Sequence, residues 1–268
     1  MPRKYRLDQL LYRKQLTPSR EKARGHILAG NVLINDEVIT KVGCLVDENV
    51  SLRLKVNERY VSRGGLKLEK AIQTFSIDVN GLIALDVGSS TGGFTDCLLQ
   101  HGVQQVYSVD VGYNQLDYHL RNHDQVIVME KLNAKNLDSK LFDKAINLAV
   151  IDVSFISLTR ILSSVLSVLK DKEIIALIKP QFEVGRQISG FKGVVRLAED
   201  HLKALHLVND YALSIGLFTQ SLTYSPMKGP KGNMEFLIHW SDHESKKLMD
   251  FKSLVNEAHQ GLSGCILK

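Results

Sequence analysis

Residues 60–242 alternate between short apolar segments and amphipathic segments, and this alternation constrains the fold more than any other feature. The apolar segments are rich in Val, Ile and Leu, as buried strands are, and the segments between them have helical periodicity. Strands that are joined by helices pair in parallel. The pattern therefore predicts an α/β fold with a Rossmann-like, mostly parallel sheet. We expect strands at 82–87, 105–110, 126–129, 147–152 and 173–179, and helices at 66–75, 94–101, 115–122, 158–169 and 198–215.

Two further apolar segments, 217–224 and 235–240, follow the last of these helices. Only residues 225–234 separate them, so we expect an antiparallel pair at one end of the sheet. With the five earlier segments they make a seven-stranded sheet. Residues 243–268 have the pattern of a charged helix and a tail, and they contain nothing that indicates chemistry.

The first 59 residues carry the whole net charge of the chain. They contain 12 Lys and Arg against 7 Asp and Glu, whereas the rest of the chain contains 22 of each, for a formal net charge of +5. A segregated basic segment favours a polyanionic partner, because Lys and Arg release counterions from phosphates. Charge alone leaves a solvated helix face as the alternative. We expect a small α+β domain over 1–59, the α/β domain over 60–242, and a C-terminal helix and tail over 243–268.

The pattern inside the basic segment favours a polyanionic partner over a solvated helix face. Residues 6–12 and 20–28 predict two short amphipathic helices, with Ser19 or Thr17 as the N-cap of the second. Residues 31–35 and 51–56 predict strands, with turns at 36–37 and at Gly43. The arrangement resembles the small αL RNA-binding domain of a small-subunit ribosomal protein and of pseudouridine synthases, which implies RNA binding. The basic residues expected at one end of the helix pair are Arg13, Lys14, Arg20, Lys22 and Arg24.

The composition is that of a soluble globular protein. Hydrophobic residues make up 44% of the 268 residues, charged residues 24%, and the mean hydropathy is -0.06. No run approaches the roughly 18 apolar residues of a membrane-spanning helix, and the first residues lack the apolar region of a secretory signal. Cys44, Cys97 and Cys265 are widely spaced, and the histidines show no metal-binding pattern. We therefore expect a cytoplasmic protein without a metal site.

A glycine-rich loop follows the first predicted strand and reads Asp86-Val-Gly-Ser-Ser-Thr-Gly-Gly-Phe94. Glycines at such a turn let a ligand approach the backbone closely, but the spacing is not the G-x-G-x-x-G of dinucleotide-binding proteins. Asp86 would repel a pyrophosphate and suits a cationic ligand, such as the sulfonium and amino groups of S-adenosylmethionine. Asp110 ends the second strand, where a carboxylate commonly accepts hydrogen bonds from ribose hydroxyls. The alternative is that Asp86 and Asp110 only cap turns.

Two charged residues follow buried strands directly, at the edge of the sheet where open α/β folds bind ligands. Asp152 follows Ala149-Val-Ile, and Lys179 follows Ile174-Ile-Ala-Leu-Ile178. Pro180 cannot continue a strand ladder, so we expect the strand to end at Lys179 and to direct it into the cleft. Such buried charges are costly unless they are paired or used. A simple ion pair between Asp152 and Lys179 is the alternative.

The whole chain resembles the TlyA-type proteins, in which an αL RNA-binding domain is fused to an FtsJ-like ribosomal RNA methyltransferase. The motifs that carry the resemblance lie at residues 60–67, 86–95, 152–155 and 179–183. The resemblance implies a class I methyltransferase fold, S-adenosylmethionine as cofactor, and 2′-O-methylation of a ribose in ribosomal RNA or ribosomal subunits. The Lys-Asp-Lys-Glu tetrad of the family falls on Lys67, Asp152, Lys179 and Glu235.

The same resemblance implies the cofactor-binding residues. The loop reads Ser-Ser-Thr where more distant FtsJ-like enzymes often have Ala-Ala-Pro, and the acidic residue that contacts adenine has no clear counterpart. We assign that role to Asn133 or Glu130. The other implied cofactor-binding residues are Asp86, Gly88, Ser89, Ser90, Thr91, Gly92, Gly93, Phe94 and Asp110.

The chemistry of methyl transfer to a ribose hydroxyl accounts for the tetrad. A hydroxyl is a weak nucleophile, so it needs in-line positioning and a group that accepts its proton. We expect Lys179 to act as the base or to orient the hydroxyl, with the other three residues orienting both. Lys67 favours neutral Lys179 by like-charge repulsion, and Asp152 and Glu235 favour the charged form. The sequence leaves open which effect prevails.

Other readings remain for parts of the chain and for the whole. Residues 227–235 are a flexible turn or a segment near the RNA backbone, and residues 182–186 with Lys192 and Arg196 form a second basic segment. The protein as a whole could be a non-catalytic RNA-binding or ribosome-associated protein. A membrane-active haemolysin is a third reading, because some members of the family carry that name. No signal peptide, spanning segment or long amphipathic helix supports it.

Overall fold

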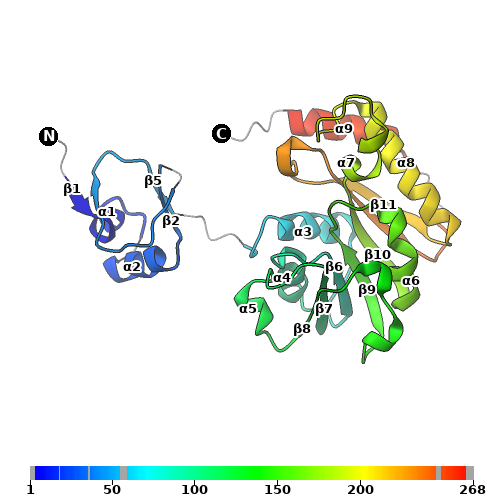
Figure 1. Cartoon of the computed structure of the whole chain (residues 1–268), viewed down its shortest axis with the longest axis horizontal. Helices are drawn as coiled ribbons and strands as arrows, with labels where there is room; N and C mark the ends of the chain where they lie inside the picture. The colour runs from blue at the N-terminus through cyan, green and yellow to red at the C-terminus, as the bar shows by residue number, and fades with distance from the viewer. Residues whose placement is uncertain (1–3, 18, 36, 55–58, 246–248, 264–268) are drawn as a thin grey trace. The chain divides into compact units, whose positions relative to one another are not determined.

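The computed structural model describes residues 4–17, 19–35, 37–54, 59–245 and 249–263 (Figure 1). Several positions lie outside these residues: Pro18, Asp36, Cys265 and the end of the segment expected as a strand at 51–56. The side chain of Arg186 also lies outside them. The chain divides into two compact units, Met1–Glu58 and Arg59–Lys268. We call them the N-terminal unit and the C-terminal unit and describe each by itself.

The N-terminal unit packs two helices against short strands. Leu7, Leu10 and Leu11 of the first helix and Ala23 and Ile27 of the second are fully or almost fully buried, as their helical spacing predicts. Ser19 is the N-cap of the second helix, because its Oγ accepts a hydrogen bond from the Lys22 N–H at 3.1 Å. The elements are β1 (Lys4–Arg6), α1 (Leu7–Arg13), α2 (Arg20–Leu28), β2 (Val32–Ile34), β3 (Glu37–Val38), β4 (Leu45–Asp47) and β5 (Leu52–Leu54).

The strands of this unit form two small antiparallel sheets. β2 lies between β3 and β5, and β1 pairs with β4. The two predicted helices and the strands at β2 and β5 are confirmed. β1, β3 and β4 were not predicted, because strands of two or three residues are too short to show an alternating pattern. Glu37, expected in a turn, belongs to β3 instead.

The described residues of the C-terminal unit form one seven-stranded sheet in the order β11-β12-β10-β9-β6-β7-β8. β6, β7, β8, β9 and β10 are parallel, and β12 is antiparallel to both β10 and β11. The predicted Rossmann-like sheet with an antiparallel pair at one end is confirmed. Its strands are β6 (Ile83–Val87), β7 (Gln105–Asp110), β8 (Val126–Glu130), β9 (Ile146–Ile151), β10 (Leu169–Ile178), β11 (Phe218–Tyr224) and β12 (Phe236–Ser241).

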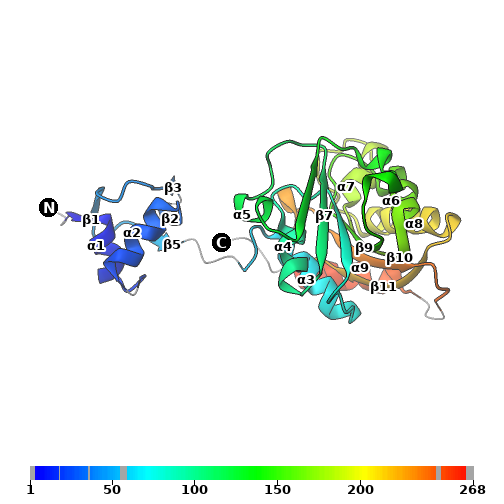
Figure 2. The same cartoon turned by 90° about the horizontal axis from the view of Figure 1, so that it is seen from below.

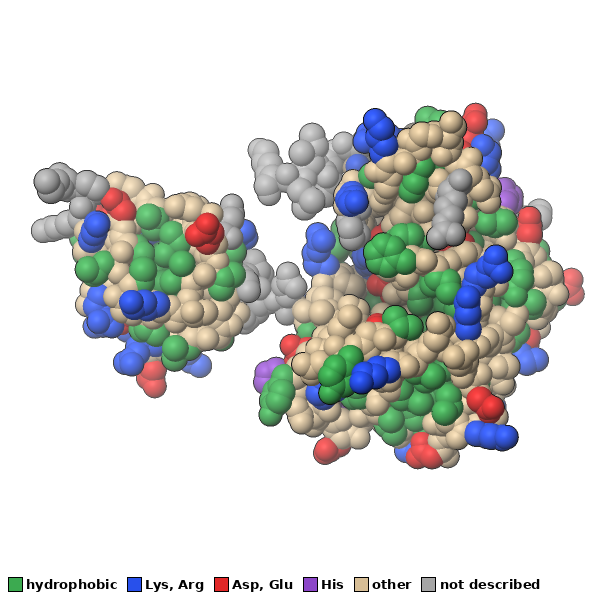
Figure 3. Space-filling view, viewed as in Figure 1, with side chains coloured by type: hydrophobic (Ala, Val, Ile, Leu, Met, Phe, Trp, Pro, Cys, Tyr) green, Lys and Arg blue, Asp and Glu red, His purple; other side chains and the backbone are tan. Residues whose placement is uncertain are grey.

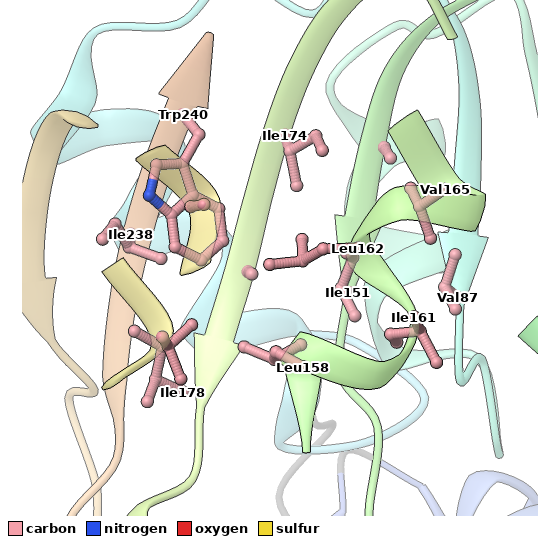
Figure 4. Close-up of a cluster of buried hydrophobic side chains, with 14 of the residues drawn as sticks. Val87, Ile151, Leu158, Ile161, Leu162, Val165, Ile174, Ile178, Ile238 and Trp240 are labelled. Carbon is pink, nitrogen blue, oxygen red and sulfur yellow. The ribbon is translucent and has the colours of Figure 1, made fainter. Parts of the chain in front are cut away.

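Helices cover both faces of this sheet (Figure 2). Successive residues of β10 face opposite sides: Ile175 packs under α3 and α4, whereas Ile174 and Ile178 pack with Trp240 under α6, α8 and α9 (Figure 4). Burial on both faces explains why these strands read as continuous apolar runs. The helices are α3 (Gly64–Phe75), α4 (Gly93–Gln100), α5 (Tyr118–Arg121), α6 (Leu162–Val168), α7 (Pro180–Glu183), α8 (Ala198–Ser214) and α9 (Phe251–Ser263).

The helix predicted at 158–169 is wrong in its extent. Ser157 caps a 3-10 turn, Leu158–Arg160, by accepting from the Thr159 N–H at 3.2 Å, and Ile161 leaves helical geometry before α6 begins. Leu169 already belongs to β10. The helix predicted at 115–122 is likewise reduced to α5. The C-terminal helix is α9, and its apolar side is part of the core beside Trp240.

No helix among the described residues is long and apolar enough to cross a membrane. The same residues contain no group of three or more His, Cys, Asp or Glu side chains placed to hold a metal ion.

Candidate active site

Two adjoining cavities lie at the carboxyl ends of the parallel strands, where open α/β sheets bind their ligands. The first cavity has a volume of about 590 Å³ and the second about 470 Å³. Both volumes are in the range of small-molecule sites. The residues that line both cavities are Gly88, Ser90, Asp152, Ser154 and Phe155. A ligand in one cavity can therefore meet a ligand in the other at the glycine loop and at the loop that follows β9.

All four residues of the predicted tetrad line the first cavity. Lys67 lies on α3, Asp152 follows β9, Lys179 follows β10, and Glu235 directly precedes β12. Segments that are far apart in the sequence thus place four charged side chains in one cavity. Lys67, Lys179 and Glu235 are buried, and the Asp152 side chain is 21% exposed.

The tetrad is divided into two ion pairs. Lys67 Nζ lies 2.6 Å from Glu235 Oε2, and Lys179 Nζ lies 2.5 Å from Asp152 Oδ1. Lys179 Nζ also donates a hydrogen bond to Ser154 Oγ at 3.0 Å. The Asp152–Lys179 ion pair, which the sequence left as the alternative, is present, and it lies in the wall of a cavity. Each ammonium has its own carboxylate, so the arrangement fixes the position of both lysine side chains.

Backbone conformation explains the glycines of the loop. Gly88 has a φ of +84°, and a Cβ at this position would lie 2.7 Å from the carbonyl oxygen of Asp152. The loop therefore passes against the β9 loop at a distance that only glycine permits. Gly92 has a φ of +98°, and a Cβ there would meet Leu120 at 2.3 Å.

Asp110 fixes the loop from the neighbouring strand. Its carboxylate accepts a hydrogen bond from the Ser90 N–H at 2.9 Å and another from the Gly112 N–H at 2.7 Å. Asp110 and Ser90 also line the second cavity. Asp110 therefore both caps the turn, which was the alternative reading, and lines the cavity.

The predicted loop residues divide between the two cavities. Gly88 and Ser90 line both, while Ser89, Thr91, Gly93 and Phe94 line only the first. Gly92 and Asp86 line neither. Gly92 is the residue before α4, so its function is to turn the chain into that helix.

Asp86 lies beneath the loop instead of facing a cavity. It is fully buried, and its Oδ2 accepts a hydrogen bond from Thr95 Oγ1 at 2.6 Å, while Thr95 Oγ1 is 2.7 Å from Ser108 Oγ. Burial, with smaller contributions from the carboxylates of Asp152 and Asp110, raises the pKa of Asp86 to about 7 against the opposing effect of the Thr95 hydrogen bonds. Asp86 joins β6 to the first turn of α4.

Of the two candidates for adenine contact, Asn133 faces the second cavity. Its Oδ1 accepts a hydrogen bond from the Lys135 N–H at 3.0 Å, which leaves its amide nitrogen for a ligand. Glu130 is instead held by Arg121 and by the Gln115 N–H. Burial opposes ionisation of Glu130, but these hydrogen bonds and that of Asn114 lower its pKa.

In the N-terminal unit, all five predicted RNA-binding residues are exposed. Arg13 and Lys14 lie at the end of α1, and Arg20, Lys22 and Arg24 lie in α2, which six residues separate from α1. Arg20 has a second role, because it donates to the buried Asp8 at 2.8 Å. Burial raises the pKa of Asp8, but Arg20 and Arg6 lower it by a larger amount.

Three site residues were not assigned from the sequence. Ser154 accepts from Lys179, and Phe155 and Phe182 form an aromatic pair at 5.1 Å between ring centroids. Phe155 is 87% exposed and has a φ of +66°, an uncommon conformation for an aromatic residue. The motifs at 152–155 and 179–183 contain all three, but only the structure shows that the two motifs pack against each other.

Comparison with known proteins agrees with this geometry. The family model for FtsJ-like methyltransferases matches residues 60–241, and the S4 domain model matches residues 6–51. The fold and the site define a Rossmann-like methyltransferase. The chain belongs to the FtsJ-like methyltransferase family and carries an S4 domain in its N-terminal unit.

Relatives match nearly the whole length of this chain. YqxC of Bacillus subtilis is 44% identical over 97% of this chain and 96% of its own length. The 16S/23S rRNA (cytidine-2′-O)-methyltransferase TlyA of Mycobacterium tuberculosis is 36% identical over 98% of this chain and 99% of its own length. A solved structure from Streptococcus thermophilus is 42% identical and covers 97% of both chains, with a TM-score of 0.75. The resemblance to TlyA-type proteins is thereby confirmed.

Proposed function

We propose that this chain transfers a methyl group from S-adenosylmethionine to the 2′-hydroxyl of a ribose in ribosomal RNA. The observation that carries the proposal is the two ion pairs, buried Lys67–Glu235 and partly buried Lys179–Asp152, in a cavity that adjoins a second cavity at the glycine loop. The printed activity of the relative TlyA, rRNA (cytidine-2′-O)-methyltransferase, supports the choice of substrate and of the ribose oxygen.

The second cavity fits the cofactor. Gly88 lets the glycine loop pass close to the β9 loop at the cavity wall, Asp110 offers a carboxylate for ribose hydroxyls, and Asn133 offers an amide for the adenine. When bound, S-adenosylmethionine supplies an electrophilic methyl group on a positively charged sulfur. Asp86 lies beneath the loop and supports the turn into α4. It acts on the cofactor site through the loop conformation.

The first cavity then receives the target ribose, and its charged residues position the hydroxyl. Lys179 is held by Asp152 and Ser154, so its Nζ has a fixed place from which it orients the hydroxyl. In its neutral amine form, after its own proton has left, the same nitrogen receives the hydroxyl proton. Lys67 and Glu235 form the other side of the cavity. Because most of the gain in methyl transfer comes from alignment, the rigidity of the two ion pairs favours catalysis.

Binding of RNA is supported by features of both units. The five exposed basic residues of the N-terminal unit lie in a matched S4 domain, and basic side chains of this kind bind phosphates. In the C-terminal unit, the exposed ring of Phe155 lies at the first cavity, where an unstacked base can rest on it. We propose that the partner is ribosomal RNA or a ribosomal subunit and that the protein acts in the cytoplasm.

Replacing Lys179 by Met tests the proposal. The variant loses the proposed proton acceptor but keeps every residue of the second cavity, so we expect methyl transfer to ribosomal subunits to fall at least about 1,000-fold, in line with the loss of a general base together with hydroxyl alignment. Binding of S-adenosylmethionine, measured by calorimetry, should change less than about threefold. The exposed Lys203 provides the control, since Lys203→Met should keep full activity.

Two results would count against the proposal. Full activity of Lys179→Met would exclude Lys179 from the chemistry. A wild-type protein that binds ribosomal subunits and S-adenosylmethionine but transfers no methyl group would favour the non-catalytic RNA-binding reading.

A further inference from the structure

One wall of the first cavity is built from two segments that are distant in the sequence. Phe191 and Gly193 come from the segment 188–197, which precedes α8. Lys228, Gly229 and Lys231 come from the segment 227–234, which precedes β12. We call these two segments together the basic wall.

Asn233 joins the two segments. Its side chain is 2% exposed, and its Oδ1 accepts a hydrogen bond from the Val195 N–H at 3.0 Å. Its Nδ2 donates to the Gly193 carbonyl at 2.9 Å, so the amide pairs with the first segment as another peptide group would. The Asn233 carbonyl also accepts from the Gly229 N–H at 2.8 Å. One buried residue thus holds both segments in register.

The basic wall contains cations and no carboxylate. Residues 188–197 include Lys192 and Arg196, residues 227–234 include Lys228 and Lys231, and neither segment has an Asp or Glu. Lys231 reaches across to the first segment, because a Cβ on Gly193 would lie 3.7 Å from Lys231 Nζ. Glu235 follows directly, but it is already paired with Lys67.

The acidic residues of the first cavity do not neutralise the positive charge of the basic wall. The two acidic residues among those that line the first cavity, Asp152 and Glu235, each have a lysine partner within 2.6 Å. Of the four cations of the wall, Lys228 and Lys231 line the first cavity, so their positive charge is left for a ligand beside the place where the target ribose is proposed to bind. In Figure 3, blue side chains lie around the hollow of the C-terminal unit. A polyanion that enters the cavity would gain from this wall.

We infer that Asn233 is a positioning residue that joins the two segments into one basic wall, and that this wall binds the phosphate backbone next to the target nucleotide. The inference rests on the proposed function, because it takes RNA as the occupant of the first cavity. It adds a second RNA contact in the C-terminal unit, separate from the basic residues of the N-terminal unit.

Three full-length variants test it. Asn233→Ala removes both hydrogen bonds to the first segment, while Asn233→Asp keeps the acceptor for Val195 and loses the donor to Gly193. Asn209→Ala is the matched control: Asn209 is also a buried amide, it accepts from Thr219 Oγ1 at 2.6 Å, and it lines neither cavity.

We expect Asn233→Ala to weaken binding to ribosomal subunits about tenfold, equivalent to about 1.4 kcal/mol. Trypsin should cleave the native variant faster after Lys192 and Arg196, because the first segment is released. Affinity for S-adenosylmethionine should stay within about twofold, since the second cavity does not include the wall. Asn233→Asp should lie between Ala and wild type in trypsin sensitivity, and Asn209→Ala should match wild type in RNA affinity and in cleavage at these two sites.

The charge of the wall has its own test. Lys228→Gln with Lys231→Gln should reduce the slope of log affinity against log salt concentration by up to about 1.8, because each phosphate contact by a cation contributes about 0.9 to the slope on duplex nucleic acid. An unchanged slope would remove the phosphate-binding role.

Two further outcomes would overturn the role of Asn233: unchanged trypsin cleavage and RNA affinity in Asn233→Ala, or equal effects in Asn209→Ala. Binding and proteolysis need no methyl transfer, so they separate this inference from the proposed function. A protein that binds RNA through the wall without methylating it would refute the proposed function alone.

Discussion

Replacing Lys67 by Met should lower the free energy of unfolding, because it breaks the buried Lys67–Glu235 ion pair. The Lys67 side chain is 10% exposed and that of Glu235 is fully buried, and their charged atoms are 2.6 Å apart. Glu235 Oε1 has no hydrogen-bond partner in the described part of the chain. The substitution therefore leaves a buried carboxylate without its cation, which costs about 3–5 kcal/mol of unfolding free energy.

A second substitution separates the lost charge partner from the lost packing. Glu235→Gln in the Lys67→Met background removes the uncompensated charge, so the double variant should be at least about 2 kcal/mol more stable than Lys67→Met alone. This difference would show that Lys67 and Glu235 contribute to stability as an interacting pair, as their 2.6 Å separation requires.

The assay is urea unfolding followed by tryptophan fluorescence. The chain has a single tryptophan, Trp240, which is fully buried on β12 of the C-terminal unit. Its signal therefore reports on the unit that contains the ion pair. Lys203→Met serves as the control, because Lys203 pairs with Asp200 at 3.1 Å but is 67% exposed, so its loss should cost less than about 1 kcal/mol. If Lys67→Met costs no more than Lys203→Met, the reasoning about buried charge is refuted.

Three other predictions concern the cofactor loop and the RNA-binding surface. Because the pKa of Asp86 is raised to about 7, above its unfolded value of about 3.9, the proton that it binds stabilises the folded state at low pH, and this contribution is lost as the pH rises through 7. Asp86→Asn has no such proton to lose. In urea titrations, its free energy of unfolding should therefore fall less than that of wild type between pH 5 and pH 8. Gly88→Ala should weaken binding of S-adenosylmethionine at least about tenfold by calorimetry, while Gly81→Ala, where φ is also positive but nothing lies within 4 Å of the added Cβ, should not. Changing Arg13, Lys14, Lys22 and Arg24 to Gln should lower the salt dependence of RNA binding and leave cofactor affinity unchanged.

Sequence reasoning succeeded where one local pattern decides the structure. The strands of the large sheet are buried on both faces, so Ile174–Ile178 and similar runs are recognisable without tertiary information. The boundaries between 157 and 169 were not predictable, because a serine cap and the pairing of Leu169 with Ile146 override helical periodicity there.

The site was predictable only as a set of residues. The resemblance named the tetrad, and the structure brings all four side chains into one cavity. The division into two ion pairs depends on side-chain geometry that no spacing reveals. The same holds for Asn233, whose hydrogen bonds reach residues 38 and 40 positions away. Asp86 was expected to face the ligand, but its hydrogen bond to Thr95 places it beneath the loop.

The most direct test of the central claim is to incubate the full-length protein with separated ribosomal subunits and S-adenosylmethionine labelled in the methyl group, and then to map the label. We predict that wild-type protein places the label on a ribose 2′-oxygen of ribosomal RNA and that Lys179→Met places none. Label on a base, or no label on either subunit or on free ribosomal RNA, would contradict the account.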